Sequence, residues 1–151
     1  MRKTICGILI AATTILTTMT LASCDIETSS AAGDFNGMWH LTRVDTLATG
    51  GVLDLKKEKI YWAFQYKLMQ ADDKNEKHPK ILMRFNQTNT QLTLHTPYCY
   101  DRENGDVPLS DPTLLAPYGI NKLEENFQVI KLTGSKMVLQ SETLKLTFKG
   151  F

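Results

Sequence analysis

The sequence predicts an all-β domain, an antiparallel barrel of about eight short strands with one long irregular loop. Two observations support this prediction. Apolar and polar residues alternate along several short segments, which is the pattern of strands with one buried face. Tight polar turns separate these segments, and no convincing long helix is visible. Because a sandwich of two β-sheets would show nearly the same pattern, it stays open as the alternative.

Residues 1–23 have the organisation of a secretory signal peptide. A short basic start, Met1-Arg2-Lys3, precedes an apolar stretch, and small residues stand just before Cys24. The apolar stretch is short and rich in threonine for a membrane span, which needs about 20 predominantly apolar residues. We therefore expect residues 1–23 to be removed from the mature protein.

The end of this segment, Leu21-Ala22-Ser23-Cys24, resembles the lipobox of bacterial lipoproteins. The resemblance implies that the Cys24 thiol receives a diacylglycerol group and that its amine, freed by cleavage, is then acylated. Several acyl chains would give a stable membrane anchor, because each buried methylene contributes about 0.8 kcal/mol. The alternative is an ordinary cysteine in an uncleaved signal anchor.

Charge and cysteine content narrow the function classes. Because Arg2 and Lys3 leave with the signal, the remainder carries 15 basic and 16 acidic residues and a net charge of −1. This balance lacks the basic footprint of a nucleic-acid-binding protein. Cys6 also leaves with the signal, so Cys99 has no partner for a disulfide within the chain. We expect Cys99 to be buried and inert rather than a free reactive thiol.

Residues 24–33 are expected to be a lipidated flexible tether, because they are small and polar. Residues 34–151 have the length of one domain with a single core. The clearest strand is 59–68, where Ile60, Trp62, Phe64 and Tyr66 recur at period two. The other expected strands are 35–44, 52–55, 81–87, 91–96, 127–133, 136–141 and 143–149.

Two polar regions interrupt the strands. Residues 72–80 are expected to be a solvated hairpin loop. Residues 97–126 form a longer connection with four prolines, and long connections of this kind are often functional. A short helix is expected to start near Ser110-Asp111-Pro112. Tyr98, Tyr100 and Tyr118 are candidates for a binding surface on this loop, and a simple lid over one end of the barrel is the alternative.

Four passages resemble the lipocalins, and lipocalin-like lipoproteins of gut and oral Gram-negative bacteria in particular. They are Gly37-x-Trp39, residues 60–65, Leu115-x-x-Tyr118-Gly119-Ile120, and the alternating end at 137–148. The resemblance implies a small eight-stranded barrel whose end is plugged by Trp39, on a protein of the cell envelope, with the outer membrane as its expected location. The chain is short for a lipocalin, which disfavours a roomy cavity.

A barrel of eight strands can hold packed side chains or one small ligand. The aromatic and sulfur-containing residues expected inside are therefore candidates for binding a small apolar or amphipathic ligand, with ordinary core packing as the alternative. These candidates are Trp39, Trp62, Phe64, Tyr66, Met83 and Phe85.

The sequence shows no motif for catalysis, a metal or a cofactor. The acidic pairs Asp72-Asp73 and Glu124-Glu125 are expected to be solvated surface. We therefore expect a binding protein rather than an enzyme. Two hypotheses follow: a small ligand bound inside the barrel, or a protein or glycan bound by the outer surface and residues 97–126.

Overall fold

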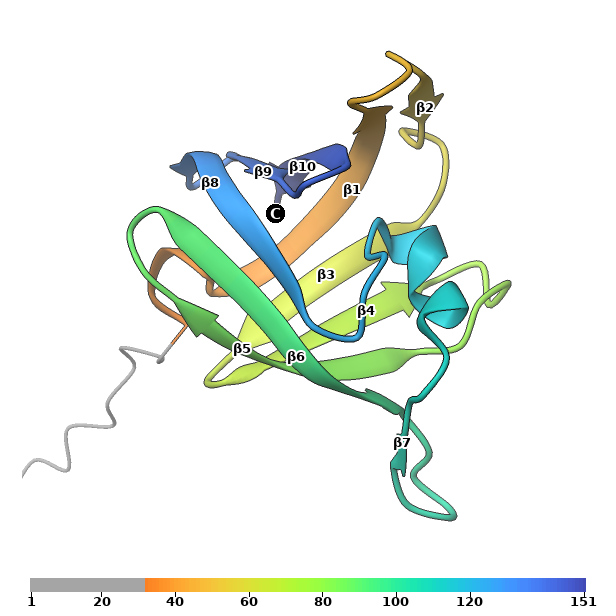
Figure 1. Cartoon of the computed structure of the whole chain (residues 1–151). Coiled ribbons are helices and arrows are strands. Elements are labelled where there is room, and N and C mark those ends of the chain that lie inside the picture. The colour runs from red at the N-terminus through yellow and green to blue at the C-terminus, as the bar shows by residue number, and fades with distance from the viewer. Residues whose placement is uncertain (1–31) are drawn as a thin grey trace, which may run out of the picture.

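The first strand of the domain pairs with the last, and this pairing closes the sheet into a barrel (Figure 1). The computed structural model describes residues 32–151; the expected signal peptide, Cys24 and most of the tether lie outside the described residues. The elements are η1 (Gly33–Phe35), β1 (Gly37–Thr46), β2 (Val52–Asp54), β3 (Ile60–Gln65), β4 (Leu68–Asp73), β5 (Ile81–Gln87), β6 (Gln91–Cys99), β7 (Val107–Pro108), η2 (Pro112–Tyr118), β8 (Glu125–Thr133), β9 (Lys136–Gln140) and β10 (Leu144–Gly150).

The barrel consists of eight strands in the order β1-β3-β4-β5-β6-β8-β9-β10, each antiparallel to its neighbours. Trp39 lies opposite Gly150, and Thr46 lies opposite Leu144, so β1 and β10 pair over most of their length. The two remaining strands are appendages: β2 pairs with β1, and β7 pairs with β6. The expected all-β barrel is confirmed, and the sandwich alternative is wrong because the sheet has no open edge between β1 and β10.

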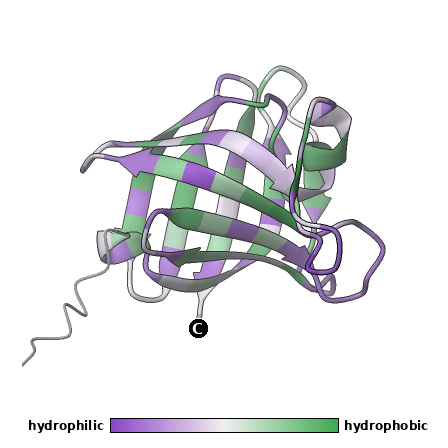
Figure 2. Cartoon of the chain, turned by 90° about the horizontal axis from the view of Figure 1, so that it is seen from below, coloured by the Kyte–Doolittle hydropathy of each residue, from purple (hydrophilic) through white to green (hydrophobic). Residues whose placement is uncertain are grey.

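Side chains alternate between the interior and the surface along most strands. In β3, for example, Ile60, Trp62 and Phe64 are buried, while their neighbours Tyr61 and Ala63 are only half-buried. Figure 2 shows the corresponding alternation of hydrophobic and hydrophilic residues along the ribbons. Within residues 32–151 the buried apolar residues other than Val138 form one cluster, so this part of the chain contains a core of its own.

A short 3₁₀ helix lies at each end of the barrel (Figure 1). At one end η1 places Phe35 inside, where its ring centroid is 5.4 Å from that of Phe64. The indole Nε1 of Trp39 donates a hydrogen bond to the Phe35 carbonyl at 2.8 Å, which holds η1 against the barrel. At the other end η2 covers the opening.

Two expected elements differ from the structure. The expected strand 59–68 is a hairpin of β3 and β4, because the chain turns at Tyr66 and Lys67. The expected loop 72–80 is shorter, because β4 continues to Asp73. The number of barrel strands agrees with the prediction, but the membership differs: β2 lies outside the barrel, and β4 takes its place.

The long connection expected at residues 97–126 is more ordered than predicted. Strand β6 continues to Cys99 and pairs with β7, and the expected short helix is η2. The Asp111 carboxylate accepts hydrogen bonds from the backbone N–H and the hydroxyl of Thr113, which caps the start of η2. Residues 97–126 are therefore not one long irregular loop: the end of β6, β7 and η2 are ordered elements, and only the segments between them are irregular.

Candidate functional site

The barrel interior is filled by aromatic and aliphatic side chains. Trp62 is fully buried at its centre, and its ring centroid lies 4.8 Å from that of Phe148 and 5.8 Å from that of Phe127. Phe64 packs edge-on against Phe85 at 5.2 Å. Five predicted ligand-binding residues, Trp39, Trp62, Phe64, Met83 and Phe85, are buried in this cluster. They pack in the core, and none lines either of the two surface hollows described below.

The sixth candidate, Tyr66, is not on the inner face. It lies in the two-residue turn between β3 and β4, its φ is +55°, and 63% of its surface is exposed. Leu68, the next residue of the period-two pattern, is exposed as well. The pattern of residues 60–68 therefore marks an inner face only as far as Phe64. The prediction that Tyr66 lines the barrel is therefore wrong.

Residues 109–120, here called the lid, close the barrel end opposite η1. Leu115, Tyr118 and Ile120 are fully buried. From inside the barrel, Trp62 Nε1 donates a hydrogen bond to the Tyr118 carbonyl at 3.2 Å. The Tyr118 hydroxyl donates to the Pro79 carbonyl at 2.7 Å, which joins the lid to the β4–β5 loop.

Tyr118 was a candidate for the loop surface, and its burial makes that prediction wrong. Burial raises the pKa of the Tyr118 hydroxyl well above its usual value, and the nearby carboxylates of Asp73 and Asp72 raise this pKa further. The hydroxyl is therefore neutral at physiological pH and acts as a structural donor. The other two tyrosines, Tyr98 and Tyr100, are half-buried at the base of the β6–β7 hairpin.

Three carboxylates expected on the surface are buried, which corrects the reading of both acidic pairs. Asp73 accepts a hydrogen bond from the backbone N–H of Asn75 at 2.8 Å and so orders the turn after β4. Asp72 pairs with Lys74 and, at 3.7 Å, with Lys80. Glu125 accepts hydrogen bonds from two backbone N–H groups of the turn before β8. Asp73 and Glu125 therefore accept hydrogen bonds from backbone N–H groups next to the ends of β4 and β8, and Asp72 is neutralised by lysines. All three carboxylates have a structural role.

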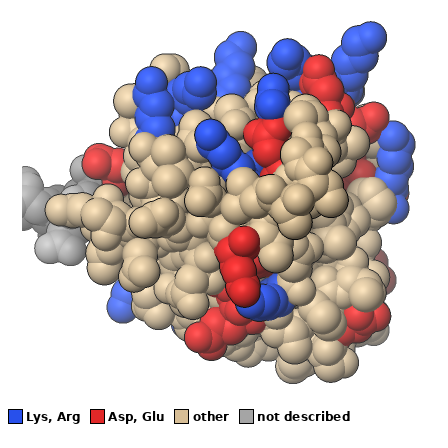
Figure 3. All heavy atoms as spheres, turned by 45° about the horizontal axis from the view of Figure 1, so that its top comes forward, with Lys and Arg blue, Asp and Glu red and all other residues tan. Residues whose placement is uncertain are grey.

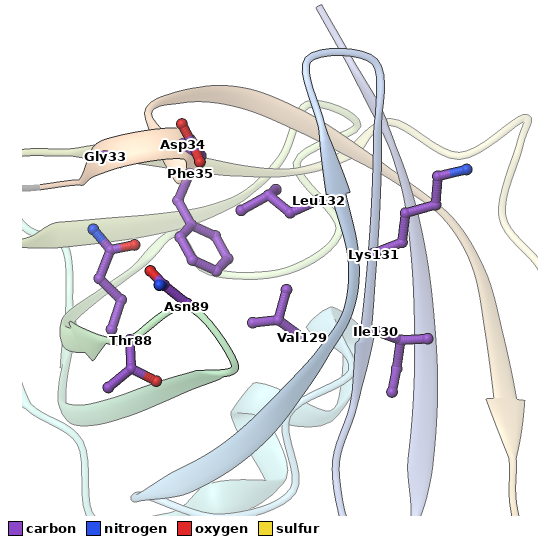
Figure 4. A pocket seen from close by; sticks show the side chains of 10 residues that line it. Gly33, Asp34, Phe35, Thr88, Asn89, Val129, Ile130, Lys131 and Leu132 are labelled. Carbon is purple, nitrogen blue, oxygen red and sulfur yellow. The ribbon is translucent and has the colours of Figure 1, made fainter.

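A hollow of about 580 Å³ lies at the η1 end of the barrel and is called here the mouth groove. Its volume falls within the usual range of small-molecule sites, about 300–1,000 Å³. Figure 4 shows Phe35, Val129 and Leu132 pointing toward one another across its apolar base. The turn between β5 and β6 supplies the polar side of the groove with Thr88 and Asn89.

The mouth groove exists because β8 extends past the first residue of its partner β6, Gln91. Residues Glu125–Gln128 pair with β6, and the Val129 N–H donates to the Thr90 carbonyl at 2.8 Å, but beyond this point β8 pairs with β9 alone. A β-bulge between Val129 and Lys131 keeps Val129 and Leu132 on the groove side. Ile130 and Lys131 also line the groove, on its β8 side.

Sequence reasoning missed the residues of the mouth groove. The segment 127–133 was expected to be a regular strand, and a bulge leaves no clear sign in one sequence. Phe35 was included in the first expected strand, whereas it belongs to η1. The spacing Gly37-x-Trp39 was the one sequence signal near this site, because it marks the start of β1, and η1 with Phe35 lies directly before it.

A closed antiparallel barrel of eight strands with a 3₁₀ helix before its first strand defines the lipocalin-like class of folds. Comparison with known proteins gives the same answer: the sequence model of the lipocalin-like domain family matches residues 19–151. The chain therefore belongs to the lipocalin-like domain family.

Two solved structures share this fold. A lipocalin-like protein from Bacteroides uniformis ATCC 8492 is 18% identical, with a TM-score of 0.59 over 79% of this chain and 100% of that one. An uncharacterised protein from Bacteroides eggerthii DSM 20697 is also 18% identical, with a TM-score of 0.55 over 78% of this chain and 99% of that one. At this identity the likeness shows the fold alone. No curated protein matches the sequence.

Residues 32–151 contain no group of three or more histidine, cysteine, aspartate or glutamate residues that could hold a metal ion. No helix in this part of the chain is long and apolar enough to cross a membrane. Cys99 is half-buried against the core and forms no disulfide with another described residue.

Proposed function

We propose that the domain binds a small amphipathic molecule in the mouth groove rather than inside the barrel. The observation that carries the proposal is the hollow of about 580 Å³ with three apolar side chains at its base and a polar turn along one side. Membership of the lipocalin-like family supports binding of a small ligand in general. The packed interior around Trp62 favours a site at the end of the barrel.

The lining of the mouth groove indicates how such a ligand would lie. Its apolar part would rest on Phe35, Val129 and Leu132, since burying apolar surface there contributes about 25 cal/mol per Å². Its polar part would face Thr88 and Asn89, which are exposed on the β5–β6 turn. In small-molecule sites a few polar groups of this kind fix the orientation of the ligand.

The test starts with native mass spectrometry of residues 25–151 purified from the protein's own host, to identify a retained ligand. Leu132→Ser should then weaken binding of that ligand by roughly tenfold, because it removes part of the apolar base. The control is Val52→Ser, which changes an exposed apolar residue of β2 that does not line the groove. Equal affinities of wild type, Leu132→Ser and Val52→Ser would place the ligand elsewhere and contradict the proposal.

We also propose that lipid on Cys24 anchors the domain in the cell envelope of a Gram-negative bacterium, in the outer membrane. The lipobox-like sequence Leu21–Cys24 supports this proposal. Cys24→Ala should abolish labelling by radioactive palmitate and move the protein from the membrane fraction to the soluble one. Labelling that persists in Cys24→Ala would overturn the anchor without affecting the ligand site.

A second candidate function is the binding of a protein or glycan by the β6–β7 hairpin. This hairpin projects from the barrel (Figure 1) and carries the exposed Val107 and the half-buried Tyr100. The Tyr100 ring lies 5.0 Å from Lys80 Nζ and 5.7 Å from the Arg102 guanidinium. A Tyr100→Ala, Val107→Ser variant keeps the lid intact, and unchanged partners in a pull-down from envelope extract would reject this candidate.

A further inference from the structure

A second hollow of about 580 Å³ lies on the outer face of the barrel, over β1, β9 and β10. We call it the lysine groove, because Lys56, Lys136 and Lys149 line it. It is separate from the mouth groove, and no residue lines both. Figure 3, turned so that the top of Figure 1 comes forward, shows basic side chains gathered along the upper edge of the molecule.

The charges in the lysine groove are not balanced by the fold. Lys136 and Lys149 lie directly opposite each other on β9 and β10, and like charges in this position destabilise a sheet. Among the described residues neither forms an ion pair, whereas Lys56 lies 3.8 Å from Asp54. From Asn126 to Phe151 the chain has four lysines and one acidic residue, Glu142, which pairs with Lys122 outside the groove.

Neutral hydrogen-bond donors stand beside these charges. Ser135 and Thr147 line the groove, and their hydroxyls form no hydrogen bond with another residue in the described part of the chain. The groove wall is fixed, since Thr42 Oγ1 donates to the Thr147 carbonyl at 3.0 Å and His40 Nε2 donates to the Glu58 carbonyl at 2.6 Å. Two unpaired ammonium groups and two free hydroxyls thus line one hollow.

We propose that the lysine groove binds a phosphate group. A phosphate carries close to two negative charges at neutral pH and several acceptor oxygens, which matches two unpaired lysines and neighbouring hydroxyl donors. Lysine commonly binds phosphate as a point charge. The bound phosphate would also remove the repulsion between Lys136 and Lys149. Its source is either a phosphorylated soluble molecule, whose phosphomonoester carries these two charges, or the headgroup of an anionic lipid, whose phosphodiester carries one negative charge; both present phosphate oxygens as acceptors.

The test uses residues 25–151 and two probes. Titration with inorganic phosphate, followed by NMR, should shift the amide signals of Ser135, Lys136 and Lys149. Lys136→Gln with Lys149→Gln should weaken this binding at least tenfold, since two charged contacts are lost. The matched control, Lys67→Gln with Arg84→Gln, removes the same charge at exposed positions around the β3–β4 turn and on β5 and should bind like wild type.

Vesicles of phosphatidylcholine with and without phosphatidylglycerol distinguish the two sources. Binding to the anionic vesicles that only Lys136→Gln with Lys149→Gln abolishes identifies a lipid headgroup. Phosphate binding without vesicle binding identifies a soluble phosphorylated ligand. If both double variants bind phosphate and vesicles like wild type, or if both lose binding equally, the proposal is overturned. Because Leu132→Ser leaves the lysine groove intact, failure here is distinguishable from failure of the mouth-groove proposal.

Discussion

Tyr66 occupies a backbone conformation that its side chain disfavours. Its φ of +55° lies in the left-handed region, which costs an L-residue roughly 1–2 kcal/mol. Two-residue hairpin turns prefer glycine or asparagine for this reason. The sequence Gln65-Tyr66-Lys67 therefore gave no sign of a turn, and the apolar pattern extended across it.

Replacing Tyr66 with glycine should stabilise the domain by about 1 kcal/mol, because glycine adopts positive φ without steric cost. The exposed ring loses little contact. The measurement is the free energy of unfolding in urea. Lys67→Gly is the matched control in the same turn, and it should destabilise, since the φ of Lys67 is not positive. A loss of stability in Tyr66→Gly would contradict the argument from backbone strain.

Tyr118→Phe should lower the free energy of unfolding by about 1 kcal/mol at pH 8, because the hydrogen bond from the Tyr118 hydroxyl to the Pro79 carbonyl is lost. The pKa of Tyr118 is raised in the folded state, so the folded protein holds this proton more tightly than the unfolded chain. Stability is then fully present below pH of about 10, the unfolded pKa, and falls as the pH rises above it.

The variant separates this effect from other titrating groups. Relative to Tyr118→Phe, wild type should lose about 1.4 kcal/mol per pH unit above pH 10. Parallel stability curves for wild type and Tyr118→Phe between pH 9 and pH 11 would show that the Tyr118 proton is not linked to folding.

At the scale of elements, the lid depends on the glycine that ends η2. Gly119 has a φ of +79°, and a Cβ at this position would lie 2.7 Å from Leu146 Cδ2. Both the conformation and the close approach to β10 therefore require glycine. Gly119→Ala should destabilise the domain by about 2 kcal/mol.

Gly134 provides the control for this prediction. It lies in the β8–β9 turn, its φ is not positive, and a Cβ there would meet nothing within 4 Å. Gly134→Ala should change the free energy of unfolding by less than about 0.5 kcal/mol. Thermal or urea unfolding of both variants is sufficient, and equal effects would mean that Gly119 is not special to the lid.

The sequence predicted strands by their alternation, and it failed where alternation does not determine structure. The hairpin of β3 and β4 was read as one strand because Ile60 to Leu68 alternate throughout. Asp73 and Glu125 were read as surface because acidic residues are rarely buried, yet backbone N–H groups of nearby turns satisfy them. Partners of this kind are set by tertiary contacts, which a single sequence does not show.

At the scale of the whole molecule, the barrel and its family were predictable, and the candidate sites were not. Alternation, the spacing of Gly37 and Trp39 and the passage around Tyr118 led to the correct fold. The mouth groove depends on how far β8 extends past β6, and the lysine groove depends on which lysines meet across β9 and β10. Both are properties of register, which remains undetermined until the strands are paired.

Closure of the sheet predicts one cooperative unit. Amide hydrogen exchange should give the slowest amides of β1 and β10 the same opening free energy as those of β5 and β6, equal to that of global unfolding. The β1–β10 pairing runs from Trp39 to Thr46, which is long enough to support this expectation. Opening of β1 and β10 at a free energy several kcal/mol below the global value would indicate a seam that separates on its own.

The pairing of Trp39 with Gly150 also has a consequence for the order of events during folding. Contacts so distant in sequence carry a large loop-closure entropy and form slowly. The first strand cannot be fully paired until the last strand has been synthesised and released. A chain exported from the amino terminus would therefore stay unfolded while it crosses the membrane, and it would complete its barrel only on the far side.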